Sequence, residues 1–245
     1  MTNKIFMVSL VLAFGCGKDK PEAKPVTPPP AVAPQEPQAV VSIDAGLKEH
    51  MHDHFSAIRK IERAIVQGDT KAAEEQATWL ASHDPSAEIS THQEQLDSLR
   101  TAAQAVASST SLEQSAKAAA ALASECGACH LATTSIASFE WTELPAAGDK
   151  VVDRMLRHQW AMDRLWEGLV GPSEMSWSDG AAVLAAEPME FPAEFSEAKR
   201  SAGTALLAKV QSLAKRAQTA DGLSARAEIY GDLLNTCSGC HKLRE

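Results

Sequence analysis

Apolar positions recur at alternating steps of three and four residues through most of the chain after residue 43. This spacing is typical of amphipathic helices packed in a bundle. In residues 44–67 the apolar stripe comprises Met51, His54, Ile58, Ile61 and Ile65. Ala, Leu, Glu, Gln and Lys, which are good helix formers, dominate this part of the chain. The pattern therefore predicts an all-α fold.

The same analysis predicts four helices in each of two halves. In the first half they cover residues 44–67, 70–82, 85–108 and 112–130, and in the second half 148–170, 178–186, 193–217 and 221–241. The third helix is expected to begin at Asp84-Pro85, because proline is favourable at the first helical position. Each half has about a hundred residues, which is enough to bury a core.

The two halves form an internal duplication. Residues 111–130 align without gaps on residues 222–241, with Leu112, Ala116 and Leu122 matching Leu223, Ala227 and Leu233. Upstream, Met51-x-x-His54-x-x-Ala57 matches Met155-x-x-His158-x-x-Ala161. Each half therefore begins with a helix that carries a Met/His pair and ends with a cysteine motif.

That motif is C-x-x-C-H, and it holds four of the five cysteines: Cys126, Cys129 and His130 in the first half, and Cys237, Cys240 and His241 in the second. In this pattern two thiols bond to haem vinyl groups and the adjacent imidazole binds the iron. A thioredoxin-like pair or a zinc site also uses C-x-x-C. Neither explains a histidine after both pairs, and zinc-site pairs would lie about 12–20 residues apart. The motifs predict two covalently bound haem c groups, with His130 and His241 as proximal ligands.

A four-helix bundle with C-x-x-C-H at the end of its last helix resembles the cytochrome c-prime and c-556 family, the class II c-type cytochromes. The resemblance covers two copies from residue 44 onward. It implies two tandem four-helix bundles, each with a haem at the end of its fourth helix, that transfer electrons. Four residues follow His241, so no downstream ligand of the kind that class I cytochromes use is expected for the second haem.

The preferred distal ligands are His54 and His158, which occupy equivalent places on otherwise apolar stripes. A buried imidazole without a partner costs a few kcal/mol, and binding iron would remove that cost. Met51 and Met155, one turn earlier, are the alternative, because six-coordinate members of the family resemble this arrangement in using a methionine on the first helix. If neither pair binds, the iron is five-coordinate and open.

The remaining histidines and the tryptophans carry less information. His50 and His52 flank His54 in a cluster of the kind that binds zinc, but the repeat preserves neither of them. They are expected to face solvent, as are His83 and His92. The tryptophans are expected to pack in the cores or against haem edges: Trp79, Trp141, Trp160, Trp166 and Trp177.

Residues 1–16 are predicted to be a signal peptide. Lys4 supplies a positive charge, and the apolar run over residues 5–14 is too short to span a bilayer. Gly15-Cys16 resembles a bacterial lipobox, which predicts lipidation at Cys16; an ordinary signal peptide with a chance cysteine is the alternative. Residues 17–42 contain seven prolines and predict an extended, disordered tether. Both alternatives export the chain, and with the lipid at Cys16 it is expected on the periplasmic side of a bacterial membrane.

The predicted organisation is a signal peptide (1–16), a tether (17–42), a first haem-binding bundle (43–131), a linker (132–147) and a second haem-binding bundle (148–245). The net charge of −9 excludes a basic nucleic-acid footprint and favours basic or locally basic redox partners. No catalytic constellation or small-molecule substrate is evident.

The sequence thus predicts a diheme electron carrier that cycles between Fe(III) and Fe(II) and is anchored to the membrane by a lipid on Cys16. A protein that binds or senses NO or CO at an open distal site is the alternative from another class. A diheme peroxidase has the least support.

Overall fold

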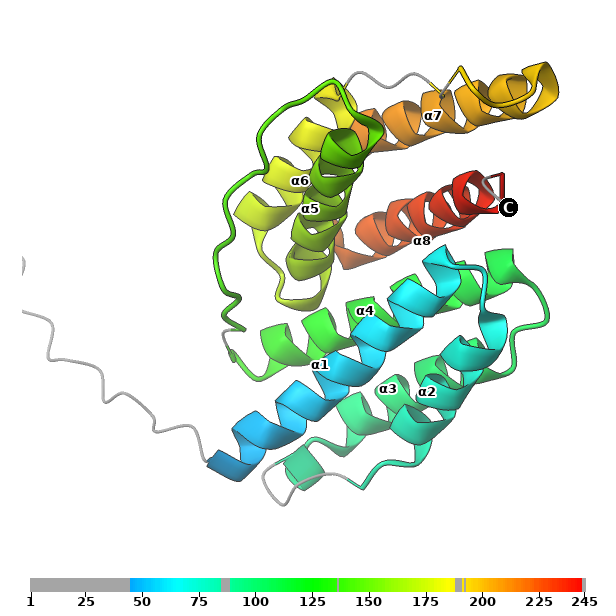
Figure 1. Cartoon of the computed structure of the whole chain (residues 1–245). Coiled ribbons are helices and arrows are strands. Elements are labelled where there is room, and N and C mark those ends of the chain that lie inside the picture. The colour runs from blue at the N-terminus through cyan, green and yellow to red at the C-terminus, as the bar shows by residue number, and fades with distance from the viewer. Residues whose placement is uncertain (1–44, 85–88, 136, 188–190, 192, 244–245) are drawn as a thin grey trace, which may run out of the picture. The chain divides into compact units, whose positions relative to one another are not determined.

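The computed structural model describes residues 45–84, 89–135, 137–187, 191 and 193–243. These residues form eight α-helices and one 3-10 turn, with no strand among them (Figure 1). The predicted all-α class is therefore confirmed. The predicted signal peptide, the tether and Cys16 lie outside the described residues.

The helices follow one another along two runs of four. The first run comprises α1 (Ala45–Val66), α2 (Thr70–Ser82), α3 (Gln93–Ala107) and α4 (Leu112–Ala132), with the 3-10 turn η1 at Ile89–Thr91. The second comprises α5 (Val151–Val170), α6 (Glu174–Ala186), α7 (Glu197–Ala217) and α8 (Gly222–Lys242). Side-chain oxygens cap the N-termini of α2, α4, α6 and α7, at Asp69, Ser111, Ser173 and Ser196. Such caps satisfy backbone N–H groups that the helix itself leaves unpaired.

Three predicted helix starts are wrong, those of α3, α6 and α7. The helix α7 begins at Glu197, after its Ser196 cap, and not at residue 193. Residues 89–91 form η1, so α3 begins at Gln93 and not at Asp84-Pro85; Pro85 itself lies outside the described residues. Ile, Ser and Thr are poor helix formers, which accounts for the turn before α3. The helix α6 begins at Glu174, ahead of the predicted residue 178, because Ser173 caps it. It is therefore as long as α2, at 13 residues each.

The helices pack both within each run and between the two runs. Successive helices pack together, α4 returns to α1, and α8 returns to α5. Between the runs, α4 packs along α8, while α1 contacts α8 and α5 contacts α4 (Figure 1). This exchange of equivalent contacts is the pattern of an isologous interface, here within one chain.

The helices α4 and α8 run antiparallel. A Cβ added at Gly127 on α4 would meet the Leu223 side chain near the start of α8, and one added at Gly231 would lie 3.0 Å from the Cα of Lys117. The C-terminal ends of α4 and α8 therefore lie at opposite ends of the pair. At a rise of 1.5 Å per residue, the two cysteine motifs are separated by roughly 30 Å along the helices.

A buried polar network joins the halves near the middle of this interface. The Tyr230 hydroxyl on α8 donates a hydrogen bond to Glu62 on α1, and Arg59 pairs with both Glu62 and Asp163 of α5. The Trp166 ring lies 5.4 Å from that of Tyr230, centroid to centroid. Arg59 and Asp163 are as far apart in sequence as His54 and His158, so equivalent positions of the two halves meet directly.

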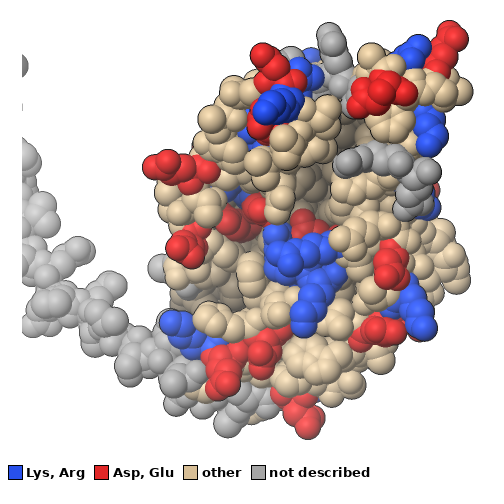
Figure 2. Space-filling model, in the orientation of Figure 1, with Lys and Arg blue, Asp and Glu red and all other residues tan. Residues whose placement is uncertain are grey.

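Charged groups of both signs are spread over the surface. In Figure 2, acidic side chains are scattered over the face in view, and a small group of basic side chains lies near its middle. No helix in the described part of the chain is both long enough and apolar enough to cross a membrane.

Candidate haem sites

The first cysteine motif occupies the last turns of α4. Cys126, Cys129 and His130 are spaced three and four residues apart, which places them on neighbouring positions of one side of the helix. Cys126 packs against the hydrophobic core, and its thiol donates to the Leu122 carbonyl at 3.5 Å. Burial raises the pKa of Cys126 to about 12. The thiol therefore stays protonated, and Cys129 beside it is half-buried.

The second motif has the same form on α8. Burial raises the pKa of Cys237 to about 12, and it also raises the pKa of Cys240. His241 is exposed in the last turn. No disulfide joins the four described cysteines. A thioredoxin-like pair needs a thiol of lowered pKa, so these buried thiols have the opposite environment.

The second residue of each motif packs against the end of the first helix of the other half. A Cβ added at Gly127 would lie 2.3 Å from the Leu169 carbonyl oxygen near the end of α5. Ser238, at the matching place on α8, is fully buried, and its Oγ lies 3.7 Å from a Cβ added at Gly68, just after α1. Each half thus packs against the cysteine motif of the other.

His130 has the environment of a ligand histidine. Burial lowers its pKa, and a hydrogen bond with the Val170 backbone opposes that shift. Its Nδ1 is buried without a hydrogen-bond partner in the described structure. Histidines that bind metal usually hold a backbone carbonyl or a carboxylate with their other ring nitrogen. His130 therefore suits the predicted proximal role.

The preferred distal candidates are also buried imidazoles. His54 is 7% exposed, and its pKa is lowered to about 3 by burial first and then by His50 and His83. His158 is half-buried, and burial lowers its pKa while Glu187 opposes the shift. Among the described residues, no hydrogen bond reaches Nε2 of either ring. Both imidazoles are therefore neutral and have a buried nitrogen that can bind a metal.

The methionine alternatives lie on the same helices. Met51 on α1 and Met155 on α5 are both half-buried. A thioether needs no hydrogen bond when it is buried. The burial of these methionines therefore does not distinguish a metal ligand from an ordinary core residue. The choice between histidine and methionine stays a prediction.

Two histidines that were expected to face solvent do not. His50 is 8% exposed and His83 is half-buried, whereas His52 and His92 are exposed as expected. The ring centroids of His50 and His54 are 4.2 Å apart, and those of His50 and His83 are 5.0 Å apart. The available signal was the spacing, because residues four apart share a helix face.

The tryptophan expectations are met in part. Trp160, Trp166 and Trp177 are buried, with the indole N–H of Trp160 donating to Thr142 and that of Trp177 donating to Ala217. Trp79 and Trp141 are 37% and 59% exposed.

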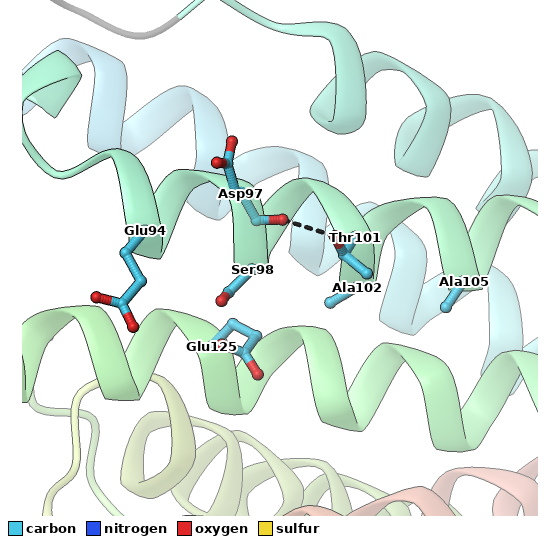
Figure 3. Close-up of a pocket in the computed structure, with 7 residues that line it drawn as sticks. All are labelled: Glu94, Asp97, Ser98, Thr101, Ala102, Ala105 and Glu125. Atoms are coloured by element: carbon cyan, nitrogen blue, oxygen red, sulfur yellow. Dashed lines mark hydrogen bonds between the residues drawn. The ribbon is translucent and has the colours of Figure 1, made fainter.

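A shallow groove runs between α3 and α4 beside the first motif (Figure 3). Its lining is acidic or small: Glu94, Asp97, Ser98, Thr101, Ala102, Ala105 and Glu125. The Thr101 hydroxyl donates to the Asp97 carbonyl at 2.7 Å. The groove contains no side chain that binds haem iron, so the site candidates remain the cysteine motifs and the buried imidazoles.

Comparisons of the chain with protein-family models, with curated proteins and with solved structures gave no match.

Proposed function

We propose that the chain is a diheme c-type cytochrome that transfers electrons. The observation that carries the proposal is the C-x-x-C-H motif repeated on the last turns of α4 and α8. The Nε2 atoms of His54 and His158, which have no hydrogen-bond partner among the described residues, support it. The residues that would hold the two haems are Cys126, Cys129, Cys237 and Cys240 as covalent attachments, His130 and His241 as proximal ligands, and His54 and His158 as preferred distal ligands, with Met51 and Met155 as alternatives.

The resemblance to class II c-type cytochromes is part of the same proposal. Two runs of four helices, each ending in a haem motif, support a tandem pair of bundles over residues 43–131 and 148–245. Haem, when bound, supplies an iron that accepts and releases one electron. The buried, protonated thiols of Cys126 and Cys237 place the attachment points beside the apolar core, and neutral imidazoles have a free electron pair for iron.

The placement of the motifs bears on the proposed route of the electrons. Because they lie roughly 30 Å apart along the antiparallel pair α4 and α8, and electron transfer slows steeply with distance, direct exchange between the two bound haems would be slow. We therefore propose that each half exchanges electrons with a partner at its own end of the molecule. The net charge of −9 favours partners with a basic surface, whose approach slows as salt rises.

The location of the protein belongs to the same proposal. A lipid on Cys16 and the proline-rich segment 17–42 would hold the two halves on the periplasmic side of a bacterial membrane. Export also suits covalent haem attachment, which takes place outside the cytoplasm.

The test is to express the full chain in a bacterium that attaches haem to exported proteins, and to measure its intact mass and its spectrum. We expect the mass of two covalent haems and a visible spectrum that changes reversibly on reduction. A chain without covalent haem under those conditions would overturn the proposal. Electron paramagnetic resonance of the ferric protein then separates the alternatives: low-spin signals at both haems support electron transfer, and a high-spin signal points to gas binding or peroxide chemistry.

A further inference from the structure

Three imidazoles from two helices meet at one end of the first run of helices. His50 and His54 lie one turn apart on α1, and His83 follows the last residue of α2 as its C-cap. The ring centroids of His54 and His83 are 5.5 Å apart, and a ligand atom of each of the three residues lies within 4.8 Å of those of the other two. Side chains that are far apart in the sequence are therefore brought together as a compact donor set.

The cluster lies among buried and aromatic side chains. His50 and His54 are buried, and a cation held there must replace its water with protein ligands. The Trp79 ring stacks on His83 at 4.2 Å and lies edge-on to His54 at 6.2 Å, centroid to centroid. Burial and the neighbouring rings hold His54 neutral, and the neutral ring is the form that binds metals.

The spacing is close to what a small metal ion requires. Zinc binds imidazole nitrogen at about 2.0–2.1 Å in a tetrahedral arrangement, so its ligand atoms lie roughly 3.3 Å apart. The observed limit of 4.8 Å is longer than this, so binding would require rotation of the imidazole side chains toward a common point. Three imidazoles leave a fourth position for water, and zinc, copper and nickel are the divalent ions that prefer this donor type.

The second half lacks this donor set. Position by position in the repeat, His50, His54 and His83 correspond to Arg154, His158 and Glu187. One imidazole is thus replaced by a cation and another by a carboxylate that pairs with Arg157. A tri-imidazole site is present in the first half alone.

We propose that His50, His54 and His83 form a binding site for one divalent transition-metal ion. The site goes beyond the proposed function and does not need haem, but it shares His54 with the proposed distal site of the first haem. The imidazole of His54 cannot serve both at once, so metal binding removes the preferred distal ligand from that haem.

The test uses the full, haem-loaded chain, freed of metal with a chelator and titrated with Zn²⁺ by calorimetry. We expect one site per chain that His50→Gln and His83→Gln each weaken by at least about tenfold. His52→Gln is the matched control, because His52 lies on the same helix and is exposed; it leaves the affinity unchanged. Zinc X-ray absorption should report three imidazole ligands. Equal binding by the parent chain and by the His50 and His83 variants overturns the proposal.

The same titration keeps this proposal separate from the haem proposal. The mass of the purified chain reports haem attachment before any metal is added. When Zn²⁺ binds at the site, conversion of one haem to high spin supports the site and shows that His54 was its ligand. Binding without a spectral change also supports the site, and assigns the distal position of the first haem to Met51 or to no side chain. The variants are checked by circular dichroism and by haem content, so that a misfolded chain is not mistaken for a lost metal site.

Discussion

His54 and His158 occupy equivalent positions of the two halves but face different groups. The ring of His83, the C-cap of α2, lies beside the ring of His54. In the second half, burial lowers the pKa of His158, and the carboxylate of Glu187, the C-cap of α6, opposes that shift. His83 follows His54 at the same distance in sequence as Glu187 follows His158. The duplication has therefore kept the framework and the candidate ligand and changed the group that faces it. A second imidazole lowers the pKa of the first, and a carboxylate raises it.

This difference implies that the two proposed haem sites would differ in their chemistry. A carboxylate near a ligand histidine makes that histidine a stronger base and tunes the metal it holds. The second half would therefore hold its iron in a more electron-rich site than the first. Equivalent substitutions in the two halves are the direct way to test this.

The largest effect is expected from removing one pair of attachment cysteines. The double variant Cys126→Ala/Cys129→Ala and its counterpart Cys237→Ala/Cys240→Ala should each lose one of the two haems, because no thiol remains to bond to the vinyl groups. Haem content per chain should fall by half, and a redox titration should then give the potential of the remaining haem alone. The potential measured without the first pair should be the lower one. Identical potentials would contradict the inferred difference between the halves.

The next effect is expected at the distal positions. His54→Ala and His158→Ala should each convert one low-spin ferric haem to high spin, because the iron loses its sixth ligand. Electron paramagnetic resonance and carbon monoxide binding measure the change. His92→Ala, at an exposed histidine, is the control and should leave both signals as they were. An unchanged spectrum in either distal variant would move the assignment in that half to Met51 or Met155.

Much of the framework could be predicted from the sequence. The stripe of α1, its end near residue 67 and the duplication follow from spacing and from local chemistry, which need no knowledge of the fold. The starts of α3, α6 and α7 were missed because they depend on a turn and on serine caps. Such short-range choices are weakly encoded and easily overridden.

The missed part of the site has a different cause. His50 and His83 are 33 residues apart in sequence, and their contact depends on how α1 and α2 pack. The repeat did not indicate this contact, because its second copy has Arg154 and Glu187 at the equivalent positions. The same holds for the antiparallel pairing of α4 and α8, which arises from contacts between halves.

A smaller effect is expected at the second residue of each motif. Gly127→Ala adds a Cβ 2.3 Å from the Leu169 carbonyl oxygen, and the resulting shift of backbone should cost about 1–3 kcal/mol of unfolding free energy. Ser238→Ala removes a buried hydroxyl that has no hydrogen-bond partner in the described structure, so it should be neutral or slightly stabilising. Urea unfolding of the haem-loaded variants measures both. Equal losses would contradict the close contact at Gly127.

The smallest effect at neutral pH is expected at Tyr230. This residue also gives the most specific test of the buried network that joins the two halves. Burial raises the pKa of its hydroxyl well above the ordinary 10, and Glu62 raises it further. Because the unfolded chain releases this proton near pH 10 and the folded chain does not, the stabilisation is present at neutral pH and is lost as the pH rises above 10. Tyr230→Phe should remove that alkaline loss and leave the helices intact at neutral pH.

The chain has one tyrosine, so tyrosinate absorbance reports on Tyr230 alone. In the folded parent chain we expect this absorbance to appear only together with the loss of the helical circular dichroism signal, whereas in denaturant it should appear near pH 10. The Phe variant gives the baseline for absorbance from haem. If Tyr230 ionised near pH 10 while the helices persisted, the network of Glu62, Arg59 and Asp163 would be open to water. The two halves would then be joined by the packing of α4 on α8 without a buried polar network.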